Sequence, residues 1–215
     1  MKIFWTFIFS ALCCFNSLAQ IELRAGMGIN LLSNPTLTDY INQNYAASSN
    51  QLANFNTAVI FSLEGGYFVN KTFQMGIEAA YQINSYSYPD ITGKYEFDYN
   101  IFMPSITSYY VFQGEGYNFK FGGGVGPRFS SVKETLPFTT ASNSYSSTGF
   151  GFLLRADGNT ALGNNVYANI GADFRYDWNG EPKNGSNKIM NSTANKNVDL
   201  NSLALGIKLG ITYRF

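Results

Sequence analysis

The chain contains no histidine among its 215 residues. Histidine is the side chain that most often acts as a general base in hydrolytic and acyl-transfer sites, and it is also the commonest metal ligand. Its absence excludes the usual nucleophile–histidine arrangement, and no dense spacing of carboxylates supplies a metal site in its place. The sequence therefore predicts a protein that is not an enzyme and that carries no metal or other cofactor.

The amino-terminal residues have the composition of a secretory signal peptide. A basic Lys2 precedes an apolar run over residues 3–15, and residues 17–19 (Ser-Leu-Ala) have the small-x-small form of a cleavage site. The run is shorter than the roughly 20 residues that a spanning helix needs, which disfavours a membrane anchor. We predict a cleaved signal peptide over residues 1–19 and one domain over residues 20–215.

Cysteine is almost as scarce. The chain has two, Cys13 and Cys14, and both lie within the predicted signal peptide. Lipid attachment through either is disfavoured, because neither follows a small residue. The exported domain would then have no cysteine, and so neither a disulfide framework nor thiol chemistry. This composition is compatible with an oxidising compartment.

Charge is sparse and balanced. Charged residues make up 13% of the chain, and loss of Lys2 from the 14 basic residues leaves 13 against 14 acidic ones, a net charge of −1. Such a balance offers no basic surface for nucleic acid. No run after the signal peptide is apolar enough for a spanning helix, and the mean hydropathy is −0.10. A transmembrane β-barrel has this hydropathy, because half of each strand faces a polar interior.

The last residues of the chain alternate between apolar and polar without a break. A period of two marks a β-strand with one apolar and one polar face, and an apolar face this long is typical of a strand in contact with lipid. The apolar residues are Leu203, Leu205, Ile207, Leu209, Ile211, Tyr213 and Phe215.

The same alternation recurs seven more times along the chain. Short turns near residues 70, 114 and 164 alternate with long connections, which is how outer-membrane barrels are built. The pattern predicts an all-β fold, an eight-stranded antiparallel up-and-down transmembrane β-barrel with both termini at the end of the short turns. Phe102 and Ile106 fall on the predicted inner face and make the fourth strand the least regular. The seven predicted strands that precede the last one cover residues 21–31, 58–69, 73–86, 95–112, 117–131, 148–161 and 166–178. The long connections cover 33–57, 87–95, 132–147 and 179–201.

Outward-facing aromatic residues are predicted at two levels of the barrel. Such bands are typical of the two interfaces of a membrane. The band near the short turns comprises Tyr67, Phe73, Tyr109, Tyr117, Tyr213 and Phe215, and the band near the long connections comprises Tyr99, Phe129, Phe150, Tyr176 and Trp178.

Charged residues of the predicted strands fall on the inner face. An arginine that faces lipid at mid-bilayer costs about 2–4 kcal/mol, so this placement supports the assigned register. An eight-stranded barrel has room inside only for side chains, and we therefore predict a salt-bridged lumen without an open channel. An inner cluster could also shift a carboxylate pKa for catalysis, but a structural ion network is favoured. This cluster comprises Asp173, Arg175 and Asp177, with Asp157 and Arg155. The predicted network comprises Glu22, Arg24, Glu64, Glu78, Lys120, Arg128, Arg155, Asp157, Asp173, Arg175, Asp177, Lys208 and Arg214.

Two of the long connections have features of their own. Residues 39–55 could form a short amphipathic helix, either a cap over the barrel mouth or an element that binds a partner. The connection over residues 179–201 is rich in Asn, Ser, Lys and Gly, and we expect it to be mobile.

The domain as a whole resembles the small eight-stranded outer-membrane barrels of the OmpA and OmpX type. The segment 101–112, which contains Met103-Pro104, is followed by residues 117–129 with Gly126-Pro127, and this pair is similar to strands of the PorT-type outer-membrane β-barrel family. The resemblance implies residence in the outer membrane of a Gram-negative bacterium. It also implies insertion by the barrel-assembly machinery, which would read Tyr213 and Phe215 as an assembly signal.

The main functional hypothesis is a non-enzymatic integral outer-membrane barrel with a plugged polar lumen. It would contact outer-membrane lipid and act through its extracellular loops, in surface interaction or in membrane integrity. The alternative is a narrow, porin-like transporter or a component of a secretion complex, with a protein partner at the surface or in that complex. A soluble lipocalin-like barrel is disfavoured, because that fold keeps apolar residues inside and polar ones outside.

Overall fold

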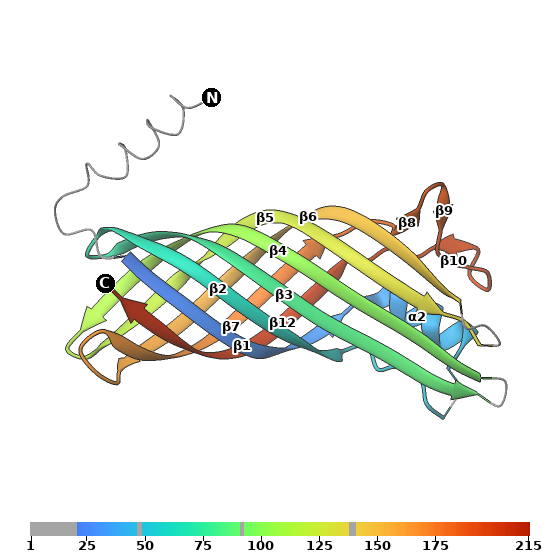
Figure 1. Ribbon diagram of the computed structural model, residues 1–215, viewed down its shortest axis with the longest axis horizontal. Helices are drawn as coiled ribbons and strands as arrows, with labels where there is room; N and C mark the ends of the chain where they lie inside the picture. Colours follow the sequence, from blue (N-terminus) through green and yellow to red (C-terminus); the bar gives the residue numbers. More distant parts are fainter. Residues whose placement is uncertain (1–20, 47–48, 91–92, 138–140) are drawn as a thin grey trace, which may run out of the picture.

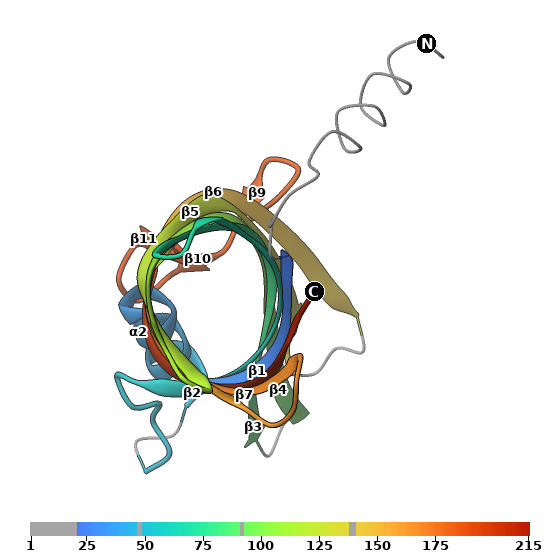
Figure 2. The ribbon, with the colours of Figure 1, turned by 90° about the vertical axis from the view of Figure 1, so that its left-hand side faces the viewer.

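Eight long strands form a closed antiparallel ring in the computed structural model, which describes residues 21–46, 49–90, 93–137 and 141–215 (Figures 1 and 2). Each strand pairs with its neighbours along the chain, and β12 closes the ring by pairing with β1. The predicted eight-stranded up-and-down barrel is confirmed. The predicted signal peptide lies outside the described residues. The long strands are β1 (Ile21–Ser33), β2 (Asn56–Asn70), β3 (Phe73–Asp90), β4 (Gly93–Gly114), β5 (Tyr117–Thr135), β6 (Ser142–Ala161), β7 (Val166–Trp178) and β12 (Ser202–Arg214).

One helix and four short strands lie at the end of the barrel opposite the carboxyl terminus (Figure 1). The helix α2 (Pro35–Asn44) begins at Asn34, whose side chain accepts a hydrogen bond of 3.1 Å from the Leu37 amide. It lies nearer the start of the connection than the predicted 39–55. The short strands are β8 (Lys183–Asn184), β9 (Asn187–Lys188), β10 (Met190–Asn191) and β11 (Lys196–Asn197).

The outer surface of the ring is apolar along every long strand. The inward and outward residues predicted from the alternation are confirmed in all of these strands except β4. On β12, for example, Ile207, Leu209 and Ile211 point outward, while Lys208 and Thr212 are buried inside. None of the helices in the described residues is long and apolar enough to cross a membrane.

The predicted facing of β4 is wrong. Phe102 and Ile106 point outward, whereas Tyr99 and Tyr109, predicted in the aromatic bands, are buried inside the barrel. In the half of β4 nearest α2, the face that points into the barrel is itself apolar, with Phe97 and other large side chains. Both faces of the strand are therefore hydrophobic there. Alternation in hydrophobicity could therefore not reveal the phase of this strand.

Four strands continue beyond the ring at the end that carries α2. Pairing between β2 and β3 ends at Val59 and Ile83, and pairing between β6 and β7 ends at Phe150 and Trp178. Past these points residues 84–90, 93–99, 130–135 and 142–149 pair with one another as a projecting sheet. The predicted long connections 87–95 and 132–147 are thus mostly strand.

The connection over residues 179–201 is packed against the barrel mouth at several points, so the prediction of a loop that is mobile throughout is wrong. Ile189, Val198 and Leu200 are buried in one cluster with Leu37 and Ile41 of α2. Side-chain hydrogen bonds join the connection to the helix, including Asn44 to Asn191 at 3.1 Å. Three apolar side chains within a polar segment are enough to fix it against the barrel mouth.

Candidate functional site: the barrel interior and its mouth

The middle of the lumen is organised around Arg155, which extends inward from β6. Its guanidinium donates to Asp173 at 2.7 Å and to Glu64 at 2.8 Å, and lies 2.5 Å from Glu78. The side chain is fully buried. Three carboxylates from three different strands therefore converge on one planar cation, whose several N–H groups suit this geometry.

Three further cations complete this central network. Arg175 lies 2.7 Å from Glu78 and 2.9 Å from Asp173. Lys208 reaches the same two carboxylates, at 3.6 and 2.8 Å. Arg24 pairs with Glu64 at 2.5 Å and also with Asp157. The central network thus holds four basic and four acidic groups with no excess charge, which makes their burial affordable.

A second cluster lies toward the end with the short turns. Glu22 pairs with Lys120 and, at 3.1 Å, with Arg214. The Arg214 guanidinium also stacks over the Phe68 ring at 4.9 Å from its centroid. Farther toward α2, Arg128 pairs with Asp177 and donates to the Ser105 hydroxyl at 3.2 Å. Every residue of the predicted network therefore lies inside the barrel and makes at least one ion pair.

Glycines on the inner face leave the space that these long side chains occupy. A Cβ at Gly126 would lie 2.0 Å from the Pro104 carbonyl oxygen. A Cβ at Gly151 would lie 2.0 Å from Asp177 and 2.6 Å from the Arg128 guanidinium. The glycine-rich character of β5 and β6 is thus explained by close strand approach and by room for the lumen side chains.

The mouth of the barrel at the end that carries α2 contains an apolar cluster, most of which sequence reasoning missed. Leu37 and Ile41 of α2 pack with Ile189, Val198 and Leu200 against the inner face of the wall. The wall contributes large side chains, mostly from β4: Ile60, Tyr86, Tyr95, Phe97, Tyr99, Ile101, Met103 and Val132. The sequence signals for this cluster were the run of apolar residues on both faces of β4 and the amphipathic segment 39–55, which contains Ile41.

A buried carboxylate ties α2 to the projecting sheet. Glu134 accepts hydrogen bonds from the Tyr40 hydroxyl at 2.7 Å and from the Tyr95 hydroxyl at 2.9 Å. The Tyr45 ring stacks on Tyr95 with centroids 3.8 Å apart. Burial, together with the nearby charge of Glu134, raises the pKa of Tyr40 and of Tyr95 well above the usual tyrosine value. Both hydroxyls therefore stay protonated and remain donors to the carboxylate.

Replacing Ile41 with aspartate should release α2 from the mouth without unfolding the barrel. Ile41 has no exposed surface, and an unpaired carboxylate in this cluster would cost several kcal/mol. The β-ladders do not involve the helix and should persist. Hydrogen exchange should show faster exchange of residues 35–44 with unchanged protection of β12. Gln43→Glu adds the same charge at an exposed residue of the helix and keeps the oxygen that accepts from the Asn191 amide, so this control should leave exchange of the helix nearly unchanged.

The carboxylates of the interior are engaged in ion pairs, which supports a structural role for them. Asp173, Arg175 and Asp177, considered above for catalysis, each contact an oppositely charged group of another strand. In the described part of the chain, no group of three or more His, Cys, Asp or Glu side chains is arranged to hold a metal ion.

Comparison with known proteins shows a likeness in fold. No protein-family model matches the chain, and no curated protein matches it in sequence. A major outer membrane protein from Thermus thermophilus matches with a TM-score of 0.56 and 15% identity, over 93% of this chain and 100% of that one. The attachment invasion locus protein Ail of Yersinia pestis matches with a TM-score of 0.53 and 16% identity, over 93% and 100%.

The outer membrane protease OmpT from Escherichia coli is also similar, with a TM-score of 0.51 and 11% identity over 93% of this chain and 99% of that one. Because identities this low show the fold alone, and because one neighbour is a protease, the fold does not decide the activity. Membership of the PorT-type family stays a prediction. The chain has the fold of the bacterial outer-membrane β-barrels.

Proposed function

We propose that the protein is a non-enzymatic integral barrel of a Gram-negative outer membrane that acts through the parts projecting beyond the membrane. The proposal is supported first by the outer surface. Apolar side chains cover it along all eight strands, and Ile77, Ile106 and Ile207 each expose more than 60% of their surface. A soluble protein rarely exposes a continuous apolar patch of this extent, whereas lipid requires one.

The contacts inside the barrel support a closed lumen. The ion network fills its middle, the Glu22 cluster lies at one end, and the apolar cluster with α2 lies at the other. Eight-stranded barrels have interiors that side chains can fill. In this proposal the protein does not conduct, and its work is surface interaction or stabilisation of the membrane.

The proposed orientation places α2, the projecting sheet and residues 179–201 outside the cell, and both termini in the periplasm. Outer-membrane barrels carry short turns on the periplasmic side and longer connections on the other. Insertion would depend on the barrel-assembly machinery, with Tyr213 and Phe215 of the last strand as the signal. Their rings pack against each other at 4.8 Å on the outer surface.

The observation that carries the proposed surface role is the open edge of the projecting sheet. Residues 142–149 of β6 pair with β5 on one side, but on the other side the only ladder contact that they make within the described residues is between Ser146 and Lys183. This edge contains neither a charged residue nor proline, the usual protections of an exposed strand. An extended segment of a partner protein could pair with it.

Single-channel recording in planar bilayers tests the closed lumen. We expect purified residues 20–215, with folding confirmed by heat-modifiable gel mobility, to give a silent bilayer.

Arg175→Ala should remain inserted but lose stability, because Glu78 and Asp173 lose a buried partner. Discrete conductance steps in the unchanged protein would instead favour the alternative, a narrow transporter or a secretion-complex component. The charged lumen is the feature that would then form the path.

A further inference from the structure

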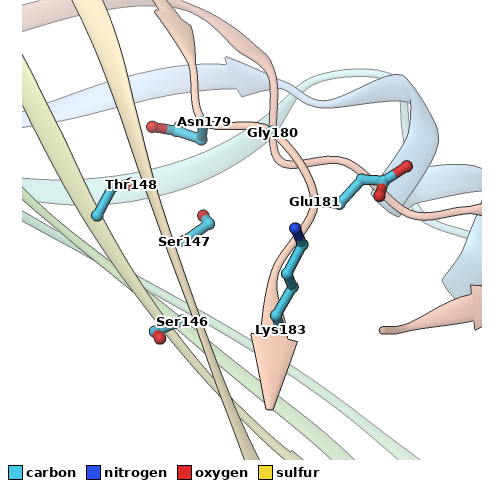
Figure 3. A pocket seen from close by; sticks show the side chains of 7 residues that line it. All are labelled: Ser146, Ser147, Thr148, Asn179, Gly180, Glu181 and Lys183. Atoms are coloured by element: carbon cyan, nitrogen blue, oxygen red, sulfur yellow. The ribbon is translucent and has the colours of Figure 1, made fainter. Parts of the chain in front are cut away.

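A polar pocket lies where β6 separates from the chain that follows β7 (Figure 3). The ladder between the two strands ends at Phe150 and Trp178, and β6 next meets this side of the barrel at Ser146 and Lys183. The intervening residues do not pair across the gap, which leaves a cavity of about 510 Å³. Its volume is within the range of small-molecule sites. Ser146, Ser147, Thr148, Asn179, Gly180, Glu181 and Lys183 line it.

The pocket has buried polar atoms that the protein does not satisfy. Asn179 is fully buried, and its side-chain amide donates to the Tyr99 hydroxyl at 3.1 Å and to the Leu200 carbonyl at 3.0 Å. Its Oδ1 and the Oγ of Ser147 are buried and have no hydrogen-bond partner among the described residues. In Figure 3 the Asn179 oxygen points toward β6, on which Ser147 lies. Buried polar atoms of this kind are costly unless a ligand or water meets them.

Of the two charged side chains that line the pocket, one makes an ion pair and the other does not. Glu181 is engaged by Lys188 at 2.6 Å and by the Asn197 amide at 3.2 Å. Lys183, by contrast, is exposed and makes no ion pair with any residue that the structure describes, although its charge acts on the Glu181 carboxylate. The pocket therefore offers hydroxyl and amide groups in its wall and, at its edge, an ammonium that no ion pair engages. This set complements the hydroxyls of a sugar and the charge of an attached phosphate.

The position of the pocket indicates where such a ligand would come from. Trp178 and Phe150 form the last pair of the β6–β7 ladder before the pocket, and they are 48% and 50% exposed on the outer surface. Tryptophan and other aromatic residues on barrels lie at the level of the lipid headgroups. The pocket then opens at the headgroup level of the outer leaflet, a placement that rests on the proposed function.

We propose that this pocket binds a phosphorylated sugar, with Asn179 and Ser147 meeting its hydroxyls and Lys183 its phosphate. A glycolipid headgroup of the outer leaflet and a free sugar phosphate share this chemistry.

The test uses Trp178, which is the only tryptophan within residues 20–215 and directly precedes Asn179, a residue that lines the pocket. Titration of the folded protein in detergent with glucose 1-phosphate should change its fluorescence with saturation. Lys183→Gln should weaken binding of glucose 1-phosphate about tenfold and leave binding of glucose unchanged, since only the former uses the ammonium. Ser147→Ala should weaken both sugars. Lys71→Gln, the same change in a turn at the opposite end, is the matched control and should alter neither.

A second arm identifies the source of the ligand. If the ligand is a headgroup, the affinity for glucose 1-phosphate should fall in nanodiscs that contain phosphorylated glycolipid, relative to nanodiscs of phosphatidylcholine. Equal affinity in the two would indicate a free sugar phosphate. The proposal is overturned if folded protein shows no saturable response, or if Lys183→Gln and Lys71→Gln bind glucose 1-phosphate equally well. Failure of the chain to insert into either nanodisc would contradict the proposed function instead.

Discussion

Replacing Ile207 with arginine is expected to block stable insertion into a membrane, whereas the same change at Leu162 is expected to be tolerated. The two side chains are almost equally exposed, at 64% and 67%. Ile207 lies in the middle of β12, opposite Ile29 and Ala172 of the flanking strands, while Leu162 lies in the turn between β6 and β7. A guanidinium facing mid-bilayer lipid costs about 2–4 kcal/mol, and near the interface it costs about 0–1 kcal/mol.

The pair separates a membrane barrel from a soluble one. In water both substitutions replace an exposed apolar side chain with a charged one, and neither should destabilise the fold. Folding of residues 20–215 into vesicles, followed by heat-modifiable gel mobility, measures the inserted fraction. A total stability of about 5–15 kcal/mol leaves little margin for a loss of this size. Equal insertion of Ile207→Arg and Leu162→Arg would contradict the lipid-facing assignment.

The strands that could be predicted from the sequence are those whose two faces meet different surroundings. Along β12, lipid-facing Ile207 and Leu209 flank the buried Lys208, so the alternation is strong and gives the register. Along β4 the inner face meets the apolar cluster and the outer face meets lipid, so Phe97 inside and Phe102 outside look alike. The phase of such a strand depends on contacts far away in sequence, with α2 and residues 179–201, which local periodicity does not record.

For the lumen, the sequence revealed which residues lie inside but not which of them pair. An arginine such as Arg155 was assigned inward because lipid excludes it. Its partner Glu64 is 91 residues away, and Arg24 meets Asp157 across 133 residues. Because side chains of this length cross a narrow barrel, their ion-pair partners depend on the shear of the strands and on the side-chain rotamers as well as on strand order. The pocket beside Trp178 was equally hidden, because it arises where the β6–β7 ladder ends.

Replacing Arg155 with methionine is expected to cost about 3–5 kcal/mol of unfolding free energy, the usual effect of removing one partner from a buried ion network. The central network holds equal numbers of basic and acidic groups, and the variant would leave it with one excess negative charge. Methionine fills much of the volume of the arginine side chain, so the loss of unfolding free energy should come from the unpaired negative charge more than from a cavity. Arg214→Met is the control, because Arg214 is partly exposed and pairs with Glu22 alone, and its cost should be smaller.

Denaturant unfolding in lipid vesicles, followed by the fluorescence of Trp178, measures both variants. If unpaired charge is the cause, Asp173→Asn should be less harmful in the Arg155→Met background than in the unchanged protein, because it restores neutrality. The resulting coupling should be about 0.5–3 kcal/mol, the range found for residues in contact. If Arg155→Met and Arg214→Met lowered the unfolding free energy equally, with no coupling to Asp173, the charges in the lumen would not contribute to stability through their pairing. Conversely, a large coupling would show that the pairing of charges inside the barrel contributes directly to its stability.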